Sequence, residues 1–202
     1  MPRLRTALVA AFVAALLCSA GPGEAVPAAP QGYWPWLKSL RGSDALLQLR
    51  AVNQYVNRHI AFATDQEAWG EVDYWASPLE ALRKGRGDCE DYAIAKYFSL
   101  LAAGMPAALL RLVYVRARLD DGEVQAHMVL AYQVPAGNEV LVLDNLVEDV
   151  LPTTQRSDLS PVFSFNSEGL WQGLSATSAG DPSARLSRWR EVMRKARAEG
   201  FH

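Results

Sequence analysis

The apolar segment from Tyr92 to Ala103, YAIAKYFSLLAA, constrains the fold of this chain more than any other stretch. Lys96 and Ser99 are its only polar interruptions, so the predicted helix lacks a polar face and is expected to be buried on most sides. Gly104 and Pro106 end it. Such a helix needs other elements packed around it, and a chain of 202 residues, 50% of them hydrophobic, can build one domain with a sizeable core.

Helical patterns also precede this segment. Apolar residues recur at helical spacing in SDALLQLRAVNQYVNRHI, which predicts a helix that starts at Ser43 or Asp44. Pro78 can open a second, short helix that Gly85 ends. The aromatic-rich stretch between them, WGEVDYWASP, is expected to be irregular, because Pro78 disfavours helical backbone at Ser77.

The sequence after the core helix is typical of β-structure. The stretches ALLRLVYVRARL and EVQAHMVLAYQV are rich in strand-forming residues, and the turn signal Asp120-Asp121-Gly122 separates them. A third strand, EVLVLDNL, follows a turn at PAGN. Helices followed by an antiparallel meander predict an α+β domain.

The last part of the chain is less regular. The stretch from Pro152 to Gly180 is rich in Ser, Thr and Gly and gives no pattern from which an element is predicted. From about residue 183 to 199, an amphipathic helix is predicted to pack on the domain, and a membrane-surface or partner helix is the alternative. Its apolar face consists of Leu186, Trp189, Val192 and Met193.

The N-terminus has the pattern of an export signal. Arg3 and Arg5 precede an apolar run too short to span a bilayer comfortably, and small residues allow cleavage after Ala25. Residues 1–25 are therefore predicted to be a signal peptide and residues 26–202 a single periplasmic domain. An uncleaved anchor is the alternative, and bulky Leu17 disfavours lipidation at Cys18. The net charge of −2 gives no electrostatic basis for binding nucleic acid.

Removal of the signal peptide leaves one cysteine, Cys89, in a compartment that oxidises thiols. It is a buried passenger, an intermolecular bridge or a working thiol. Cys89 lies in GRGDCEDYA, in the first turn of the core helix, where the helix dipole lowers the pKa of a thiol. Three carboxylates beside it, Asp88, Glu90 and Asp91, act in the opposite direction. Asp88 can also cap the helix, with Asp91 completing a weak capping box.

A nucleophilic cysteine needs a histidine base and an orienting group. Of the three histidines, His202 is terminal and His59 suits the C-terminal end of a helix, which leaves His127 in an apolar strand. If the hairpin turns at PAGN, Asp144 lies on the same face as His127, one diagonal position away. A buried aspartate is costly without a partner, and a histidine N–H would satisfy it. Cys89, His127 and Asp144 are therefore candidates for nucleophile, base and orienter.

The motifs GRGDCEDYAIAKYF, AHMVLAY and VLDNL, with VNRHI and DYWASPLE upstream, resemble those of the bacterial transglutaminase-like cysteine proteinases, the LapG-type periplasmic proteases. The resemblance extends from about residue 31 to 170. It implies a papain-like, transglutaminase-like fold in which the nucleophile lies at the start of a core helix packed on an antiparallel sheet. It also implies the catalytic roles given above for Cys89, His127 and Asp144.

The acids beside Cys89 have two interpretations. Asp88 and Glu90 could converge on one cation, with Asp91 as a third ligand or a helix cap, and oxygen ligands alone favour Ca²⁺ over Zn²⁺. Alternatively, the three acids only satisfy the first turn of the helix. The resemblance favours calcium, because LapG-type enzymes look calcium-dependent, with the Asp and Glu beside the cysteine as ligands. Trp75 could line a substrate cleft or pack in the core.

The resemblance implies a calcium-dependent periplasmic cysteine endopeptidase that cuts a large surface adhesin near an N-terminal di-alanine site. Cleavage would release the adhesin and so control biofilm attachment. The implied partners are that adhesin and an inner-membrane cyclic-di-GMP receptor that sequesters the protease. Two alternatives stay open: an acyltransferase or amidase with the same triad, and a non-catalytic, calcium-responsive binding protein.

Overall fold

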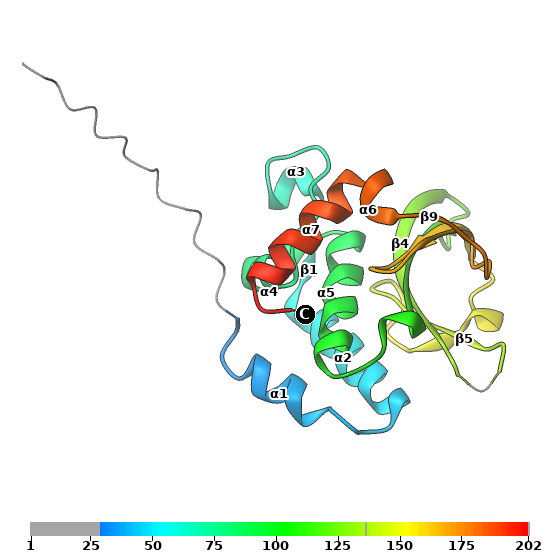
Figure 1. Ribbon diagram of the computed structural model, residues 1–202. Helices are drawn as coiled ribbons and strands as arrows, with labels where there is room; N and C mark the ends of the chain where they lie inside the picture. The colour runs from blue at the N-terminus through cyan, green and yellow to red at the C-terminus, as the bar shows by residue number, and fades with distance from the viewer. Residues whose placement is uncertain (1–28, 136, 202) are drawn as a thin grey trace, which may run out of the picture.

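The apolar helix lies at the centre of the fold. The computed structural model describes residues 29–135 and 137–201, and in it this helix is α5, Cys89–Ala102. It contacts β3 and β4 on one side and α1, α2 and α4 on the others (Figure 1). Lys96 and Ser99 are buried with their apolar neighbours, as predicted. The predicted signal peptide, residues 1–25, and the terminal His202 lie outside the described residues.

The first half of the chain forms helices around α5. The predicted start at Asp44 is confirmed, because its side chain accepts hydrogen bonds from the N–H groups of Leu46 and Leu47. The second predicted helix ends at Gly85, whose φ of 67° favours a residue without a Cβ. Two further short helices come from stretches in which no helix was predicted. The four are α1 Tyr33–Ser39, α2 Ala45–His59, α3 Asp65–Ala68 and α4 Pro78–Lys84.

An antiparallel sheet of seven strands lies beside these helices and curls away from them, in the order β6-β5-β4-β3-β7-β8-β9 (Figure 1). The three strands that come first along the chain, β3, β4 and β5, are the predicted meander. The rest come from the stretch between Pro152 and Gly180 and its edge, where no strand was predicted. The strands are β3 Leu110–Arg118, β4 Val124–Gln133, β5 Val140–Leu143, β6 Leu151–Pro152, β7 Leu159–Phe165, β8 Leu170–Gln172 and β9 Ser178–Gly180. Single 3₁₀ turns occupy Ala107–Leu109 and Thr153–Gln155.

The register between β4 and β5 positions the site. Leu130 lies opposite Leu143, and Gln133 lies opposite Val140. This is the register that a turn at PAGN predicts, and it brings Asp144, the residue after β5, towards His127 on β4. The predicted α+β class, with a core helix packed on an antiparallel sheet, is confirmed.

Two helices occupy the C-terminal region in which one was predicted. α6 spans Pro182–Arg185 and α7 spans Ser187–Ala198, because the backbone of Leu186 between them is not helical. Trp189 and Val192 are buried on the domain, as expected for the apolar face. The helix therefore packs within this chain along the side that the sequence pattern predicts.

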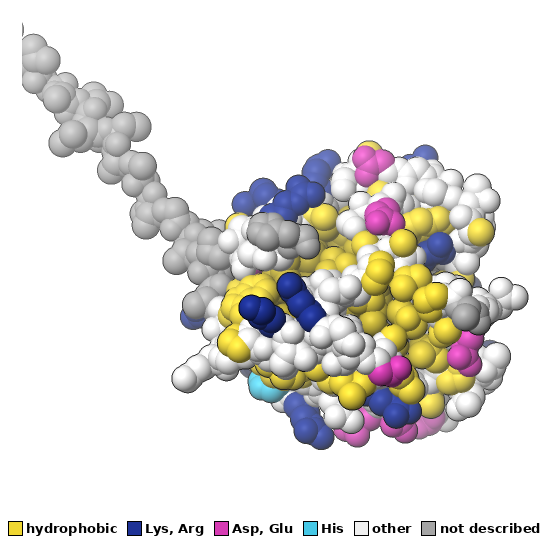
Figure 2. Space-filling model, turned by 60° about the horizontal axis from the view of Figure 1, so that its bottom comes forward, with side chains coloured by type: hydrophobic (Ala, Val, Ile, Leu, Met, Phe, Trp, Pro, Cys, Tyr) yellow, Lys and Arg dark blue, Asp and Glu magenta, His cyan; other side chains and the backbone are white. Residues whose placement is uncertain are grey.

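Charged side chains of both signs lie on the face shown in Figure 2. On the face shown in Figure 2, Lys and Arg and Asp and Glu lie mostly towards the edges, around a broad area of hydrophobic side chains. No single-sign stripe crosses this face, which agrees with the near-neutral net charge. Within residues 29–135 and 137–201, no helix has the length and hydropathy needed to cross a membrane.

Candidate active site

A short parallel pairing holds the start of α5. β1, Ala61–Phe62, pairs with β2, Arg86–Gly87, and the N–H of Ala63 donates to the carbonyl of Gly87 at 2.9 Å. Gly87 has no room for a side chain, because a Cβ there would clash with the carboxylate of Asp91. The pairing therefore brings the segment after β1 against the turn that leads into α5.

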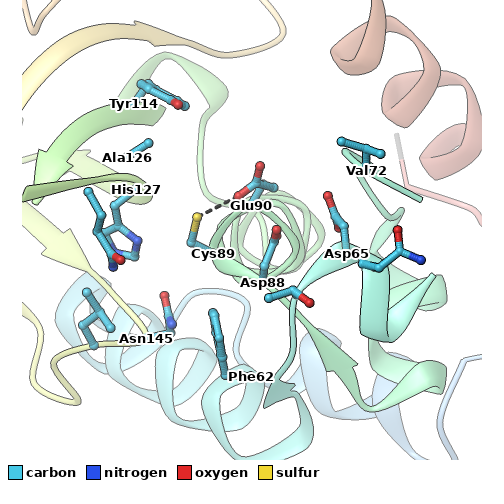
Figure 3. Close-up of a pocket in the computed structure, with 14 residues that line it drawn as sticks. Phe62, Asp65, Val72, Asp88, Cys89, Glu90, Tyr114, Ala126, His127 and Asn145 are labelled. Atoms are coloured by element: carbon cyan, nitrogen blue, oxygen red, sulfur yellow. Dashed lines mark hydrogen bonds between the residues drawn. The ribbon is translucent and has the colours of Figure 1, made fainter. Parts of the chain in front are cut away.

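A cleft of about 440 Å³ lies over the start of α5 (Figure 3). It brings together Cys89 from α5, Tyr114 from β3 and His127 from β4. Its exposed apolar side chains are Phe62, Val72 and Leu146. The other lining residues are Thr64, Asp65, Gln66, Asp88, Glu90, Gln125, Ala126 and Asn145.

Cys89 lies among acids in the structure as in the sequence. Its Sγ donates a hydrogen bond to Oε2 of Glu90 at 2.7 Å (Figure 3). Burial raises the pKa of the thiol, and the charge and hydrogen bond of Glu90 act in the same direction. A hydrogen bond from the backbone of Met128 acts against them. Burial and the neighbouring acids together favour the protonated sulfur, so a reactive thiolate needs a positive charge that offsets them.

His127 and Asp144 are joined by a hydrogen bond of 2.8 Å between Nε2 and Oδ1, and both side chains are buried. With Nε2 bonded to Asp144, Nδ1 is the nitrogen left for a thiol. His127 lines the same cleft as Cys89. The structure therefore brings together the three residues that the sequence proposes as nucleophile, base and orienter.

Asp144 has two further donors. Nη2 of Arg156 donates to Oδ2 at 2.7 Å, and the N–H of Leu146 donates to Oδ1 at 3.1 Å. Burial acts to raise the pKa of Asp144, but the hydrogen bond and charge of His127, with the hydrogen bond from Arg156, outweigh it and hold the pKa well below its usual range. An ionised aspartate in this position orients the imidazole and stabilises its protonated form. Sequence reasoning missed Arg156, because it lies in the stretch without a recognisable pattern.

Comparison with protein families identifies the family to which a chain with this site belongs. The model of the bacterial transglutaminase-like cysteine proteinases matches residues 38–175, which contain all three residues. The chain belongs to this family. It is therefore a cysteine protease, as its motifs predict. A search of the curated proteins found no match.

This transglutaminase-like proteinase is similar to solved structures of Legionella pneumophila LapG. One is 41% identical, covers 81% of this chain and 85% of that chain, and has a TM-score of 0.66. An EGTA-treated form is 42% identical over 81% of this chain and 86% of that one, with a TM-score of 0.69. A calcium-bound form is 39% identical over 80% and 86%, with a TM-score of 0.67.

The proteinase carries an acidic cluster, Asp65, Asp88, Glu90 and Asp91, beside Cys89. Donor atoms of Asp65, Asp88 and Asp91 lie within 4.8 Å of one another, as do those of Asp88, Cys89 and Glu90. Oδ1 of Asp65 and Oδ1 of Asp88 are buried without a hydrogen-bond partner. Burial raises the pKa of Asp88 to about 9, and repulsion by Glu90 and Asp91 adds to it. Hard oxygen donors, two of them unpartnered, fit a Ca²⁺ ion.

The predicted helix start at Asp88 is confirmed, but the predicted side-chain capping bonds do not form. Asp88 is the N-cap residue, with the extended backbone that is usual there (φ −104°, ψ −167°), but its side chain accepts no hydrogen bond from the first turn. Asp91 does not complete a capping box either. It is fully buried, and its oxygens accept from the N–H of Ala76 at 2.8 Å and from Nε1 of Trp69 at 3.2 Å. Asp91 thus anchors the irregular segment that precedes α4.

The structure favours one of the two interpretations of Trp75 and adds Asp65, which was not predicted, to the site. Trp75 is not among the residues that line the cleft, and its ring stacks on Phe165 with 5.8 Å between centroids. The core interpretation of Trp75 therefore fits the structure better than a role in substrate binding. Asp65 does line the cleft. It was missed because Thr64 and Glu67 form a capping box around it, so that it looks like an ordinary first-turn residue.

Proposed function

We propose that this proteinase is a calcium-dependent periplasmic endopeptidase with Cys89 as nucleophile, His127 as base and Asp144 as orienter. The observation that carries the proposal is the buried His127–Asp144 hydrogen bond behind the cleft that Cys89 lines. A cysteine at the start of a buried helix, facing a histidine held by a carboxylate, is the arrangement that activates a thiol for acyl transfer.

In the proposed reaction, the thiol of Cys89 gives its proton to Nδ1 of His127, and the sulfur attacks the carbonyl carbon of a peptide bond. Backbone N–H groups at the start of α5 bind the oxyanion. His127 then protonates the leaving amine as the C–N bond breaks, which leaves an acyl-enzyme. Water gives a proton to His127, attacks the thioester and releases the acid, and the thiol is restored.

Asp88 and Glu90 are the proposed ligands of Ca²⁺, with Asp65 as a further candidate. A bound ion would supply the positive charge that offsets the acids beside the thiol. Two observations support this: the unpartnered carboxylate oxygens of this chain, and the solved calcium-bound and EGTA-treated forms of Legionella pneumophila LapG. Asp91 is a weaker candidate, since both its oxygens already accept hydrogen bonds.

The proposed substrate is a large surface adhesin, cut near a di-alanine site in its N-terminal region and so released from the cell. The resemblance to the LapG-type proteases supports this substrate, control of biofilm attachment, and sequestration by an inner-membrane cyclic-di-GMP receptor. The apolar side chains around the cleft, Phe62, Val72 and Leu146, suit contact with small apolar residues of an extended peptide.

The test is incubation of the purified domain, residues 26–202, with the N-terminal region of the large adhesin from the same organism. We expect two fragments in the presence of Ca²⁺ and none with excess EGTA or with Cys89→Ala. Mass spectrometry of the fragments locates the cleaved bond. Cleavage by Cys89→Ala would show that Cys89 is not the nucleophile. A product joined to an added amine would identify an acyltransferase.

Calcium is tested separately from the nucleophile. We expect Asp88→Asn with Glu90→Gln to abolish cleavage at all Ca²⁺ concentrations, because the proposed ligands are lost. The matched control is Glu71→Gln, an exposed acid in the neighbouring loop that does not line the cleft, and it should cleave like the wild type. Cleavage by the double variant that no longer responds to EGTA would contradict the calcium part of the proposal.

A further inference from the structure

Asp144 is buried, yet the imidazole beside it is neutral during part of the proposed cycle. In that state His127 gives the carboxylate a hydrogen bond but no compensating charge, and an uncompensated buried charge is strongly unfavourable. The guanidinium of Arg156 supplies the missing charge. On the basis of the proposed catalytic roles, we propose that Arg156 is a positioning residue that keeps Asp144 ionised and correctly oriented while His127 is neutral.

The two oxygens of the Asp144 carboxylate accept hydrogen bonds from different donors. Oδ1 of Asp144 accepts from Nε2 of His127 and from the N–H of Leu146, whereas Oδ2 accepts from Nη2 of Arg156. The side chains of Arg156 and Asp144 are only 3% and 0% exposed, so water competes little for this contact. Rotation of the carboxylate would break bonds on both sides, and Arg156 therefore fixes the plane in which Asp144 meets the imidazole.

Arg156 is itself held in place. Asp158 accepts from Nε at 3.0 Å through Oδ1 and from Nη2 at 2.8 Å through Oδ2. The N–H of Arg156 donates to the carbonyl of Thr153 at 3.1 Å, which closes the 3₁₀ turn after β6. Asp158 is 36% exposed, so the chain of contacts runs from the surface through Arg156 and Asp144 to His127.

Other charged groups surround the pair but do not replace this contact. On the cleft side of His127 lie Cys89 and Glu90 from α5 and Tyr114 from β3. From within α5, Lys96 attracts Asp144 through space, and its ammonium lies 5.7 Å from the ring centre of Tyr92. Arg156 is the cation that donates directly to Asp144. Its removal is therefore expected to change the charge balance at His127 more than removal of Lys96.

The first test does not depend on any substrate. The chain has three histidines, so ¹⁵N spectra of histidine-labelled protein resolve His127, and His127→Gln assigns its signals. We expect Arg156→Met to raise the pH midpoint of His127 protonation by on the order of 1 to 2 pH units, because the imidazolium must then balance Asp144 alone. Arg156→Lys retains the charge and should leave the midpoint close to that of the wild type.

The second test measures catalysis on the adhesin region. Arg156 does not line the cleft, so we expect Arg156→Met to lower kcat about 10- to 100-fold with little change in KM. The kcat of Arg156→Lys should lie between those of the wild type and Arg156→Met, because an ammonium cannot bond Asp144 and Asp158 with the same planar geometry. Asp158→Asn weakens the contacts that hold Arg156 without removing its charge. It should also lower kcat and leave KM nearly unchanged.

Arg111→Met is the matched control, since Arg111 on β3 stacks on Trp171 and bonds the carbonyl of Ser175 away from the triad. It should change neither the His127 midpoint nor kcat. An unchanged midpoint in a folded Arg156→Met variant would overturn the inference. If that variant does not fold, unchanged kcat in both Arg156→Lys and Asp158→Asn would overturn it. Failure of the wild type to cut the adhesin would count against the proposed substrate alone.

Discussion

Lys96 shows how one buried charge changes stability with pH. It is 1% exposed in the middle of α5. Burial lowers its pKa from 10.5 to about 7, although attraction by Asp144 acts the other way. Below about pH 7 both the folded and unfolded chains carry the proton, so the full cost of burying the ammonium is present. Between that pH and 10.5 only the unfolded chain is charged, so this cost falls as pH rises.

We therefore expect Lys96→Met to raise the free energy of unfolding by about 2 to 4 kcal/mol below pH 7, and by progressively less towards about pH 10. Urea unfolding at about pH 6 and about pH 9 measures the difference. Lys38→Met, an exposed lysine of α1, should change stability by less than about 0.5 kcal/mol at either pH. An equal gain for Lys96→Met at both pH values would show that burial of the charge is not the cause.

The site residues could be predicted only where local pattern and long-range pairing agreed. Cys89 at a helix start and the His127–Asp144 pair follow from a buried helix and a hairpin register, both readable from apolar periodicity. Asp65 and Arg156 reach the site through a short parallel pairing and a 3₁₀ turn, which leave no periodic signal. Asp88 occupies the N-cap position, but its side chain makes no capping hydrogen bond and lies in the acidic cluster, which Asp65 joins from a distant part of the chain.

At the scale of elements, long segments were predictable, and short ones only where turn or capping residues mark their ends, as with α4 and β5. α2, α5 and strands β3 and β4 each span nine residues or more, enough for a period of 3.6 or 2 to emerge from the background. β6, β8 and β9 have two or three residues each. Such strands form because a neighbouring strand offers hydrogen bonds, so their cause lies in the sheet rather than in their own residues.

α7 holds the segment of residues 74–76, which is bonded to the start of α5, through contacts of Lys195. Nζ of Lys195 donates to Glu80 at 2.6 Å, to the hydroxyl of Tyr74 at 3.1 Å and to the carbonyl of Trp75 at 3.0 Å. The next residue along that segment, Ala76, donates to Asp91 in the first turn of α5. α7 is therefore connected to the site through two successive polar contacts.

We expect Lys195→Met to lower the free energy of unfolding by about 1 to 3 kcal/mol, because it leaves a largely buried carboxylate and a carbonyl without their shared donor. Chemical unfolding measures the loss. Hydrogen exchange of the Ala76 amide should become faster as well, because the contacts of Lys195 hold the segment in which this amide lies. Arg190→Met, on the exposed side of α7, serves as the control. A loss of stability without faster exchange at Ala76 would place the effect of Lys195 outside this segment.

At the scale of the whole molecule, the acidic cluster should couple ion binding to folding. Asp88, Glu90 and Asp91 are neighbours along the chain at the start of α5, but Asp65 comes from α3 and joins them only in the folded chain. A cation that needs this grouping binds the native state and not the unfolded one. It then stabilises the protein by an amount that grows with its free concentration, about 2.7 kcal/mol at 100 times Kd.

We therefore expect Ca²⁺ to raise the Tm of the wild type in a concentration-dependent way, and EGTA to reverse it. Asp88→Asn with Glu90→Gln should behave differently in both respects. Its Tm without metal should exceed that of the wild type, because repulsion among the acids is relieved, and added Ca²⁺ should no longer raise it. Differential scanning calorimetry with and without Ca²⁺ measures both changes, with Glu71→Gln expected to respond like the wild type. If the acids only stabilised the helix start, the double variant would melt lower than the wild type without metal, and Ca²⁺ would shift neither protein.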